Sequence, residues 1–195
     1  MSTAEHTRPI RLFFAIRPAE AAGVAALAAL SKAARSLLQG EARWLAKDHL
    51  HLTLAFAATF PASRLDTLQE GAQEAVAGIA PFPMRSRGLA LWPSPSRARL
   101  LVALFEPEPS CMLLAARLAA LLKALGVPVE ERPFRPHITL ARLKGHCSLS
   151  QQFQPACQWR CEALELLQSH LDQHGSRHQR LASWPLLGHG LEDRA

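Results

Sequence analysis

The chain has 195 residues, 49% of them hydrophobic, which is enough to form one large packed core. Its 22 lysines and arginines against 16 aspartates and glutamates give a net charge of +6, which suits a polyanionic partner without requiring one. No segment approaches the roughly 20 apolar residues of a membrane-spanning helix, and the first residues lack the pattern of a secretory signal. We therefore expect a single cytoplasmic domain over residues 1–195, monomeric by default and without membrane contact.

Hydrophobic periodicity predicts the elements of the first half of the chain. It indicates strands over 10–16, 50–56 and 84–92, and helices over 19–38 and 61–77. Gly40 is placed to end the first helix. The strand over 50–56 has two different faces, because His51, Thr53 and Ala55 alternate with an apolar set consisting of Leu50, Leu52, Leu54 and Phe56.

The second half of the chain repeats this order. Residues 11–16 (RLFFAI) recur as 99–104 (RLLVAL), 88 positions later, and residues 51–55 (HLTLA) recur as 137–141 (HITLA), 86 positions later. A helix over 110–125, which Gly126 ends, lies between the second pair of repeated segments. The chain is therefore predicted to hold two copies of a strand, helix and histidine-strand unit, over about 10–92 and 98–186.

The tail and the cysteines complete the predicted fold. Residues 162–171 have helical propensity, but the first copy has a strand at the equivalent place, so we expect a strand there and a last strand over 178–184 after a turn at Gly175. The predicted class is α+β, with two lobes of antiparallel sheet facing a central groove. Four cysteines lack the paired spacing of common zinc sites and are expected to be reduced thiols: Cys111, Cys147, Cys157 and Cys161.

Each repeated histidine has a threonine two residues later. Residues i and i+2 of a strand point to the same face, about 6.5 to 7 Å apart, so the two motifs give two same-face pairs, His51 with Thr53 and His137 with Thr139. Packing of the two copies about a pseudo-twofold axis would bring both pairs to one cleft. One imidazole could then take a proton from water while the other gives one to a leaving oxygen, and the hydroxyls would bind phosphoryl oxygens. This chemistry suits phosphodiester hydrolysis without a metal or other cofactor.

Three neighbouring features leave alternatives open. Arg135 precedes His137 by two residues, so the same alternation makes it a phosphate ligand, unless it pairs with an acidic neighbour, Glu130 or Glu131. A zinc site built from His49, His146 and Cys147 is disfavoured, because it leaves both threonines unexplained. A single strand histidine is more often structural than catalytic, but here histidine and threonine recur at the same positions of both copies, which favours catalysis.

The paired motifs, residues 51–54 (HLTL) and 137–140 (HITL), resemble the HxTx motifs of the two-histidine phosphoesterase superfamily. Within it, the chain looks most like the bacterial RNA 2′,3′-cyclic phosphodiesterases, also called the 2′-5′ RNA ligase family. The likeness covers nearly the whole chain and includes five further segments: 11–16 (RLFFAI), Trp44, 91–94 (LWPS), 132–137 (RPFRPH) and 184–186 (WPL).

The resemblance implies a bilobal α+β fold whose motifs face each other across a groove. It also implies hydrolysis of RNA 2′,3′-cyclic phosphate ends to 2′-phosphomonoesters, with reversible 2′-5′ ligation as a related reaction. By this likeness His51 would protonate the leaving O3′, His137 would activate water, and Thr53 and Thr139 would bind the phosphate. The two motifs are so similar that the residues alone do not distinguish the acid from the base.

The chain departs from the family pattern near its end. Family members usually carry an aromatic residue before the serine of the penultimate strand, but this chain has Gln168 before Ser169 and contains no tyrosine. Phe14 and Phe56 are the alternatives for stacking on a nucleobase, although we expect both in the core. Two other functions stay open: a phosphodiesterase for another cyclic phosphate or a 2′-5′ oligonucleotide, and a non-catalytic RNA-binding module.

Overall fold

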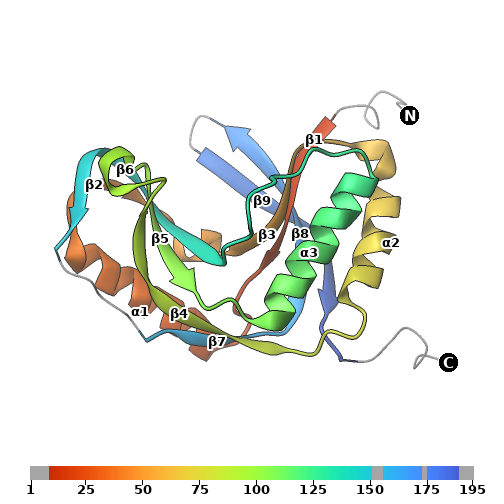
Figure 1. Ribbon diagram of the computed structural model, residues 1–195, viewed down its shortest axis with the longest axis horizontal. Helices are drawn as coiled ribbons and strands as arrows, with labels where there is room; N and C mark the ends of the chain where they lie inside the picture. The colour runs from red at the N-terminus through yellow and green to blue at the C-terminus, as the bar shows by residue number, and fades with distance from the viewer. Residues whose placement is uncertain (1–8, 151–155, 173–174, 189–195) are drawn as a thin grey trace.

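The computed structural model describes residues 9–150, 156–172 and 175–188 (Figure 1). Its α-helices are α1 (Ala21–Leu37), α2 (Leu65–Val76) and α3 (Pro109–Ala124). Its strands are β1 (Pro9–Ile16), β2 (Leu38–Trp44), β3 (Leu52–Pro61), β4 (Phe82–Trp92), β5 (Leu100–Phe105), β6 (His137–Leu149), β7 (Gln158–Cys161), β8 (Ala163–Asp172) and β9 (Gly175–Pro185). This mixture of helices and antiparallel strands confirms the predicted α+β class. In the described part of the chain, no helix is long and apolar enough to span a membrane.

The strands form one curled antiparallel sheet in the order β7-β4-β5-β6-β3-β1-β8-β9, with β2 paired to β6. At its centre, β3 and β6 meet through a single residue pair, Leu52 with Ile138. The joint divides the main path of the sheet into two halves of four strands each. One half is β7-β4-β5-β6 and the other is β3-β1-β8-β9. The strands belong to one continuous sheet, and the predicted bilobal arrangement and its origin in a duplication stay predictions.

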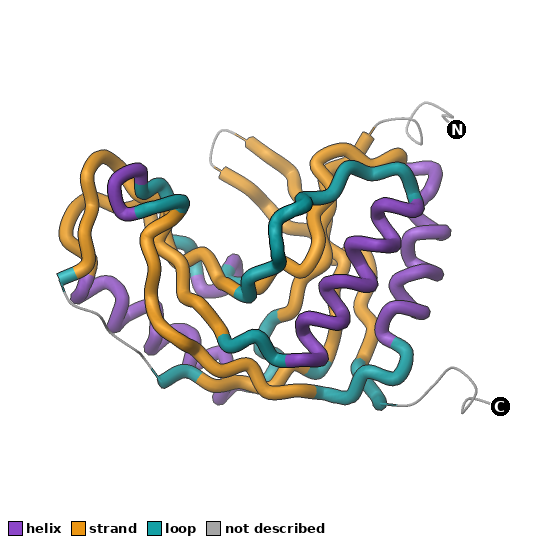
Figure 2. Tube along the Cα trace, viewed as in Figure 1, coloured by secondary structure: helices purple, strands orange, loops and turns teal. Residues whose placement is uncertain are grey.

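The helices connect the two halves. Helix α1 follows β1 but packs near β7 in the other half, whereas α3 follows β5 but packs on β3. Figures 1 and 2 show α3 beside α2 at one end of the molecule and α1 at the other end. Each half is therefore covered by a helix that follows a strand of the other half, and a shared apolar core fills the space between sheet and helices.

Helix α3 ends as predicted. Gly126 has a φ of +73°, a conformation that glycine adopts without the steric cost of a Cβ atom. Its N–H donates to the carbonyl of Lys123, and the N–H of Val127 donates to the carbonyl of Leu122. These two bonds form a Schellman motif, which satisfies the last carbonyls of the helix.

The prediction that Gly40 ends the first helix was wrong. Helix α1 ends at Leu37, and Gly40 lies within β2, a strand that the sequence analysis did not predict. The pairing of β2 with β6 shifts register between Gln39 and Glu41, and Gly40 has a φ of +116° at this bulge. A Cβ atom here would lie 2.7 Å from Sγ of Cys147, so the glycine permits close packing of the two strands.

The tail of the chain is β-structure. The expected strand over 162–171 is confirmed as β8, which pairs with β1 on one side and β9 on the other. The last strand is confirmed as β9, which begins earlier than expected. Strand β7 and the second half of β6 were not predicted, since a four-residue strand and a largely polar, exposed strand end carry a weak signal. The four cysteines are free and buried.

The joint between β3 and β6 yields a stability prediction. Ile138 is completely buried, so we expect Ile138→Ala to lower the free energy of unfolding by about 2 to 5 kcal/mol. The exposed Leu113 of α3 is a matched control, because Leu113→Ala should change stability by less than about 0.5 kcal/mol. Urea unfolding of both variants measures the difference, and equal values would contradict a buried joint.

Candidate active site

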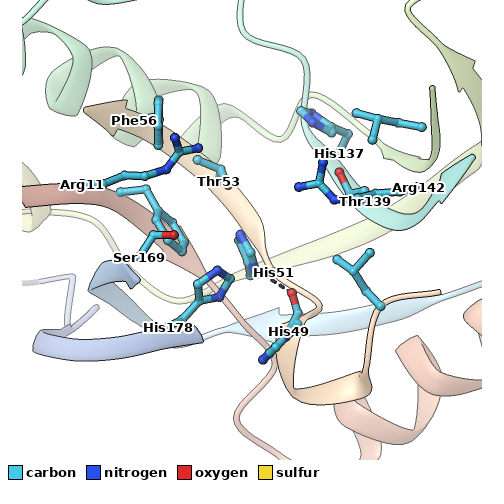
Figure 3. A pocket seen from close by; sticks show the side chains of 13 residues that line it. Arg11, His49, His51, Thr53, Phe56, His137, Thr139, Arg142, Ser169 and His178 are labelled. Carbon is cyan, nitrogen blue, oxygen red and sulfur yellow. Dashed lines mark hydrogen bonds between the residues drawn. The ribbon is translucent and has the colours of Figure 1, made fainter. Parts of the chain in front are cut away.

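A cleft of about 230 Å³ opens on the face of the sheet opposite the main core (Figure 3). The structure brings the two motif histidines and the two motif threonines together in its lining. The complete lining is Arg11, Phe13, Leu45, His49, His51, Thr53, Phe56, Leu100, His137, Thr139, Arg142, Ser169 and His178. Both halves of the sheet contribute, so the cleft lies across the joint.

The register at the joint explains why the motif residues meet. Leu52 and Ile138 are paired, and both are completely buried in the core. The residues directly before and after them therefore point to the opposite face. In this antiparallel register, each motif histidine is across from the threonine of the other motif. Because the pairing is limited to one residue pair, the strands diverge and leave room for a ligand.

Backbone carbonyls fix the orientation of both imidazoles. Nδ1 of His51 lies 2.7 Å from the carbonyl oxygen of His49, and Nδ1 of His137 lies 2.8 Å from that of Arg135. A carbonyl oxygen only accepts, so Nδ1 must carry the hydrogen in both rings. Nε2 of each neutral ring is then the acceptor, available for proton transfer in the cleft.

An aromatic ring supports each histidine. The rings of Phe13 and His51 are stacked, with centroids 4.8 Å apart, and those of Trp92 and His137 are 4.4 Å apart. These contacts restrict rotation of the imidazoles and remove part of their hydration. Each histidine is thus held by a carbonyl at Nδ1 and by contact with an aromatic ring, stacked at His51 and tilted at His137.

The environment of the cleft favours neutral histidines. The pKa of His51 is lowered from its ordinary 6.5 to about 4, mainly by burial, and the charges of His178 and Arg17 contribute in the same direction. Burial also lowers the pKa of His137, and the charge of Arg135 acts in the same direction. The bonds to the backbone carbonyls oppose these effects, because a carbonyl acceptor favours the imidazolium. An anion bound in the cleft would likewise favour the protonated rings.

Equivalent bulges follow the two motifs and bring two unexpected side chains into the cleft. In β3, pairing with β1 skips Leu54, and in β6, pairing with β5 skips Leu140. The skipped leucine and the alanine after it both point into the core, so the next residue points back to the cleft. Those next residues are Phe56 and Arg142.

The expectation that Phe56 belongs to the core was therefore wrong. The bulge interrupts the alternation after Leu54, so Phe56 lines the cleft and is 38% exposed. The guanidinium of Arg11 lies 4.5 Å from the centre of its ring. Phe14, by contrast, is completely buried, as expected. An exposed aromatic face at the end of the cleft is suited to stacking with a base.

Arg135 does not line the cleft. Its guanidinium lies 5.2 Å from the centre of the Trp92 ring, and the neighbouring Glu130 pairs with Arg132. Strand β6 begins only at His137, so the rule of alternating faces does not extend back to Arg135. The arginine that lines this side of the cleft is Arg142, which strict alternation could not identify.

The β8–β9 hairpin adds Ser169 and His178, two cleft residues that the sequence analysis did not identify. Two ion pairs to the buried Glu165 anchor this side: its carboxylate lies 2.6 Å from Nε of Arg17 and 3.2 Å from Nη1 of the more exposed Arg180. Burial alone would raise the pKa of Glu165, but the hydrogen bonds and charges of the two guanidiniums outweigh it and lower the pKa. The two ion pairs link β8 to β9 and to the residue that follows β1.

The residues of the disfavoured zinc site are not gathered in the cleft. Cys147 is buried, with Sγ 3.5 Å from the carbonyl oxygen of Glu41, and His146 is exposed outside the cleft lining. Within residues 9–150, 156–172 and 175–188, no group of three or more histidine, cysteine, aspartate or glutamate side chains is arranged to hold a metal ion.

Comparisons with known proteins identify the family. Residues 17–173 match the family model of the 2′-5′ RNA ligase superfamily, and the chain belongs to this superfamily. An RNA 2′,3′-cyclic phosphodiesterase of Thermus thermophilus is 31% identical over 149 residues, which cover 73% of this chain and 75% of the relative.

Solved structures share the fold. A crystal structure of a Thermus thermophilus protein has a TM-score of 0.79 and 28% identity, covering 91% of this chain and 98% of its own. E. coli LigT complexed with 3′-AMP has a TM-score of 0.77 and 24% identity, with the same coverage of 91% and 98%. The predicted family and fold are confirmed.

The hydrogen bonds and burial of His51 predict its titration. In ¹⁵N NMR spectra of the free protein, we expect the neutral Nδ1–H form at neutral pH and a midpoint at about 4, because desolvation penalises the imidazolium. Added inorganic phosphate should raise this midpoint, since a nearby anion favours the protonated ring. A His51→Gln variant assigns the resonance, and a midpoint at or above 6.5 in the free protein would contradict the buried environment.

Proposed function

We propose that this protein hydrolyses 2′,3′-cyclic phosphate ends of RNA to 2′-phosphomonoesters, without a metal ion. The proposal rests on one observation. Two imidazoles, each anchored at Nδ1 by a backbone carbonyl, line the same cleft, and the two motif threonines line it with them. Membership of the 2′-5′ RNA ligase superfamily and the activity of the Thermus relative support the same substrate. A cytoplasmic, monomeric protein remains part of the proposal.

In the proposed mechanism each of the two histidines carries out one proton transfer. Nε2 of His137 accepts a proton from water, and the water oxygen forms a bond to phosphorus. The bond from phosphorus to O3′ breaks, and Nε2 of His51 gives its proton to O3′. The product carries the phosphate on O2′, and exchange with solvent restores both rings. The assignment of His51 as acid and His137 as base follows the family likeness.

The negative charge on the non-bridging phosphoryl oxygens in the transition state needs hydrogen-bond donors. We propose that the hydroxyls of Thr53 and Thr139 donate to the non-bridging oxygens. Arg142 and Arg11 line the cleft and would add positive charge. A phosphate role for Arg135 stays a prediction. It would require the guanidinium to move from the Trp92 ring into the cleft.

Substrate binding would also supply the protonated acid. In the free protein the pKa of His51 is lowered to about 4, so few molecules carry the proton at neutral pH. The cyclic phosphate is an anion, and its charge beside Nε2 favours the imidazolium. Binding and protonation are therefore linked in this proposal, and the acid forms when the substrate is present.

Other substrates of the same chemistry define the alternatives. A different cyclic phosphate or a 2′-5′ oligonucleotide would meet the same histidines, and reversal of the reaction would give 2′-5′ ligation. A panel of 2′,3′-cyclic mononucleotides, RNA oligomers with cyclic ends and 2′-5′ dimers separates these activities. Activity confined to the dimers would reject the preferred substrate.

Removing either histidine tests the catalytic role. We expect His51→Ala and His137→Ala each to lower kcat by at least about 10²-fold, with RNA binding largely retained. His146→Ala is the control, because His146 is exposed and does not line the cleft. A non-catalytic RNA-binding module would instead show no turnover in the unmodified protein. EDTA should leave the activity unchanged, and inhibition that zinc reverses would contradict the metal-free mechanism.

A sulfur substitution tests which histidine is the acid. A cyclic phosphorothiolate with sulfur in place of O3′ has a leaving group that needs little protonation. We expect this substrate to restore much of the activity of His51→Ala but not that of His137→Ala, whose base is still required. Steady-state kinetics with the oxygen and sulfur substrates give the comparison. Rescue of the His137 variant alone would reverse the assignment.

A further inference from the structure

His178 lies against His51 in the cleft. It is carried by β9, opposite Ser169 of β8, so the hairpin delivers it to the wall beside the first motif (Figure 3). The centroids of the His178 and His51 rings are 5.2 Å apart, with an interplanar angle of 85°. Neither motif includes this residue, and the chemistry described above assigns it no role.

Together with other contacts, His178 restricts the movement of His51. Phe13 stacks on the imidazole at 4.8 Å, the carbonyl of His49 accepts from Nδ1, and the ring of His178 meets it edge to face. His178 also contacts the Phe13 ring, at 5.0 Å and 77°. The three rings therefore support one another, and Nε2 is the nitrogen of His51 left for a ligand.

His178 is also a titratable group among other positive charges. From the turn before β3, the ring of His49 lies 5.2 Å away. Just after β1, Arg17 contributes positive charge, and its partner Glu165 of β8 partly neutralises it. On β9 itself, Arg180 also pairs with Glu165. In such surroundings a proton on His178 disfavours one on His51, since two like charges at this distance repel.

We propose that His178 is a positioning residue for His51, which holds the imidazole in its reactive orientation and, through its own charge, controls how readily His51 accepts a proton. The inference rests on the proposed function, in which Nε2 of His51 delivers a proton to the leaving oxygen. The histidine of the second motif, His137, packs against Trp92 instead. The indole ring of Trp92 does not change its charge with pH. A neighbouring titratable ring therefore influences the protonation of His51 and not that of His137.

Two substitutions separate the ring from its charge. His178→Phe keeps an aromatic ring but removes the titratable nitrogens, and His178→Ala removes both. We expect His178→Ala to lower kcat about 3- to 10-fold with little change in KM, because the lost ring contact frees the His51 imidazole. His178→Phe should keep kcat within about 3-fold of the unmodified protein, because the contact to the ring is retained.

The decisive measurement is the titration of the His51 imidazole by ¹⁵N NMR. His178→Phe should raise its midpoint by about half a pH unit or more, because the repelling charge is gone. His146→Phe, at an exposed position outside the cleft lining, should leave kcat and the titration unchanged. The titration needs no turnover, so it tests this inference even if the substrate is a different one.

The outcomes that would overturn the inference are distinct. An unchanged His51 midpoint in His178→Phe would remove the electrostatic role, and equal loss of kcat in both variants would remove the positioning role of the ring. An increase in KM at constant kcat would make His178 a substrate contact instead. Circular dichroism and thermal unfolding of both variants show whether either fails to fold. If His178→Ala does not fold, the conservative His178→Phe variant still tests the inference.

Discussion

The site depends on one constraint, the single pairing of Leu52 with Ile138 at the centre of the sheet. Because both side chains are completely buried, the flanking histidines and threonines are forced to the opposite face. Because the pairing stops there, the two halves diverge and a cleft opens between the motifs. The same joint that completes the core thus sets the distance and facing of the reacting groups, and the helices that cross between the halves keep it closed.

Burial of the two imidazoles determines their protonation state and their response to a ligand. Desolvation lowers both pKa values, which makes the neutral forms prevalent and leaves each Nε2 free to accept a proton. It also increases the effect of any charge that enters the cleft, since interactions between charges are stronger where water is excluded. The carbonyls of His49 and Arg135 then fix which nitrogen responds. A phosphate anion is the kind of ligand to which such a site responds most strongly.

The sequence was informative where alternation held and failed where it broke. The motif histidines and threonines could be placed because period-two alternation continues through the joint. Phe56 and Arg142 could not, because each follows a bulge, and a bulge depends on the pairing partner rather than on the strand's own residues. Gly40 was assigned to a helix end for the same reason. His178 reaches the cleft through the order of the strands, which a single strand pattern does not contain.

The two motifs are nearly identical, so any difference between their roles must come from their neighbours. The first has His178, Arg17 and His49 around its histidine, and their electrostatic effect lowers the pKa of His51. The second has Trp92 against its histidine. After the equivalent bulges, the first presents an aromatic ring, Phe56, and the second a guanidinium, Arg142. A proton on His51 is therefore disfavoured by neighbouring positive charges, and a bound anionic substrate would offset them. In this cleft, the charge of the bound ligand therefore determines whether His51 is protonated and can act as the acid.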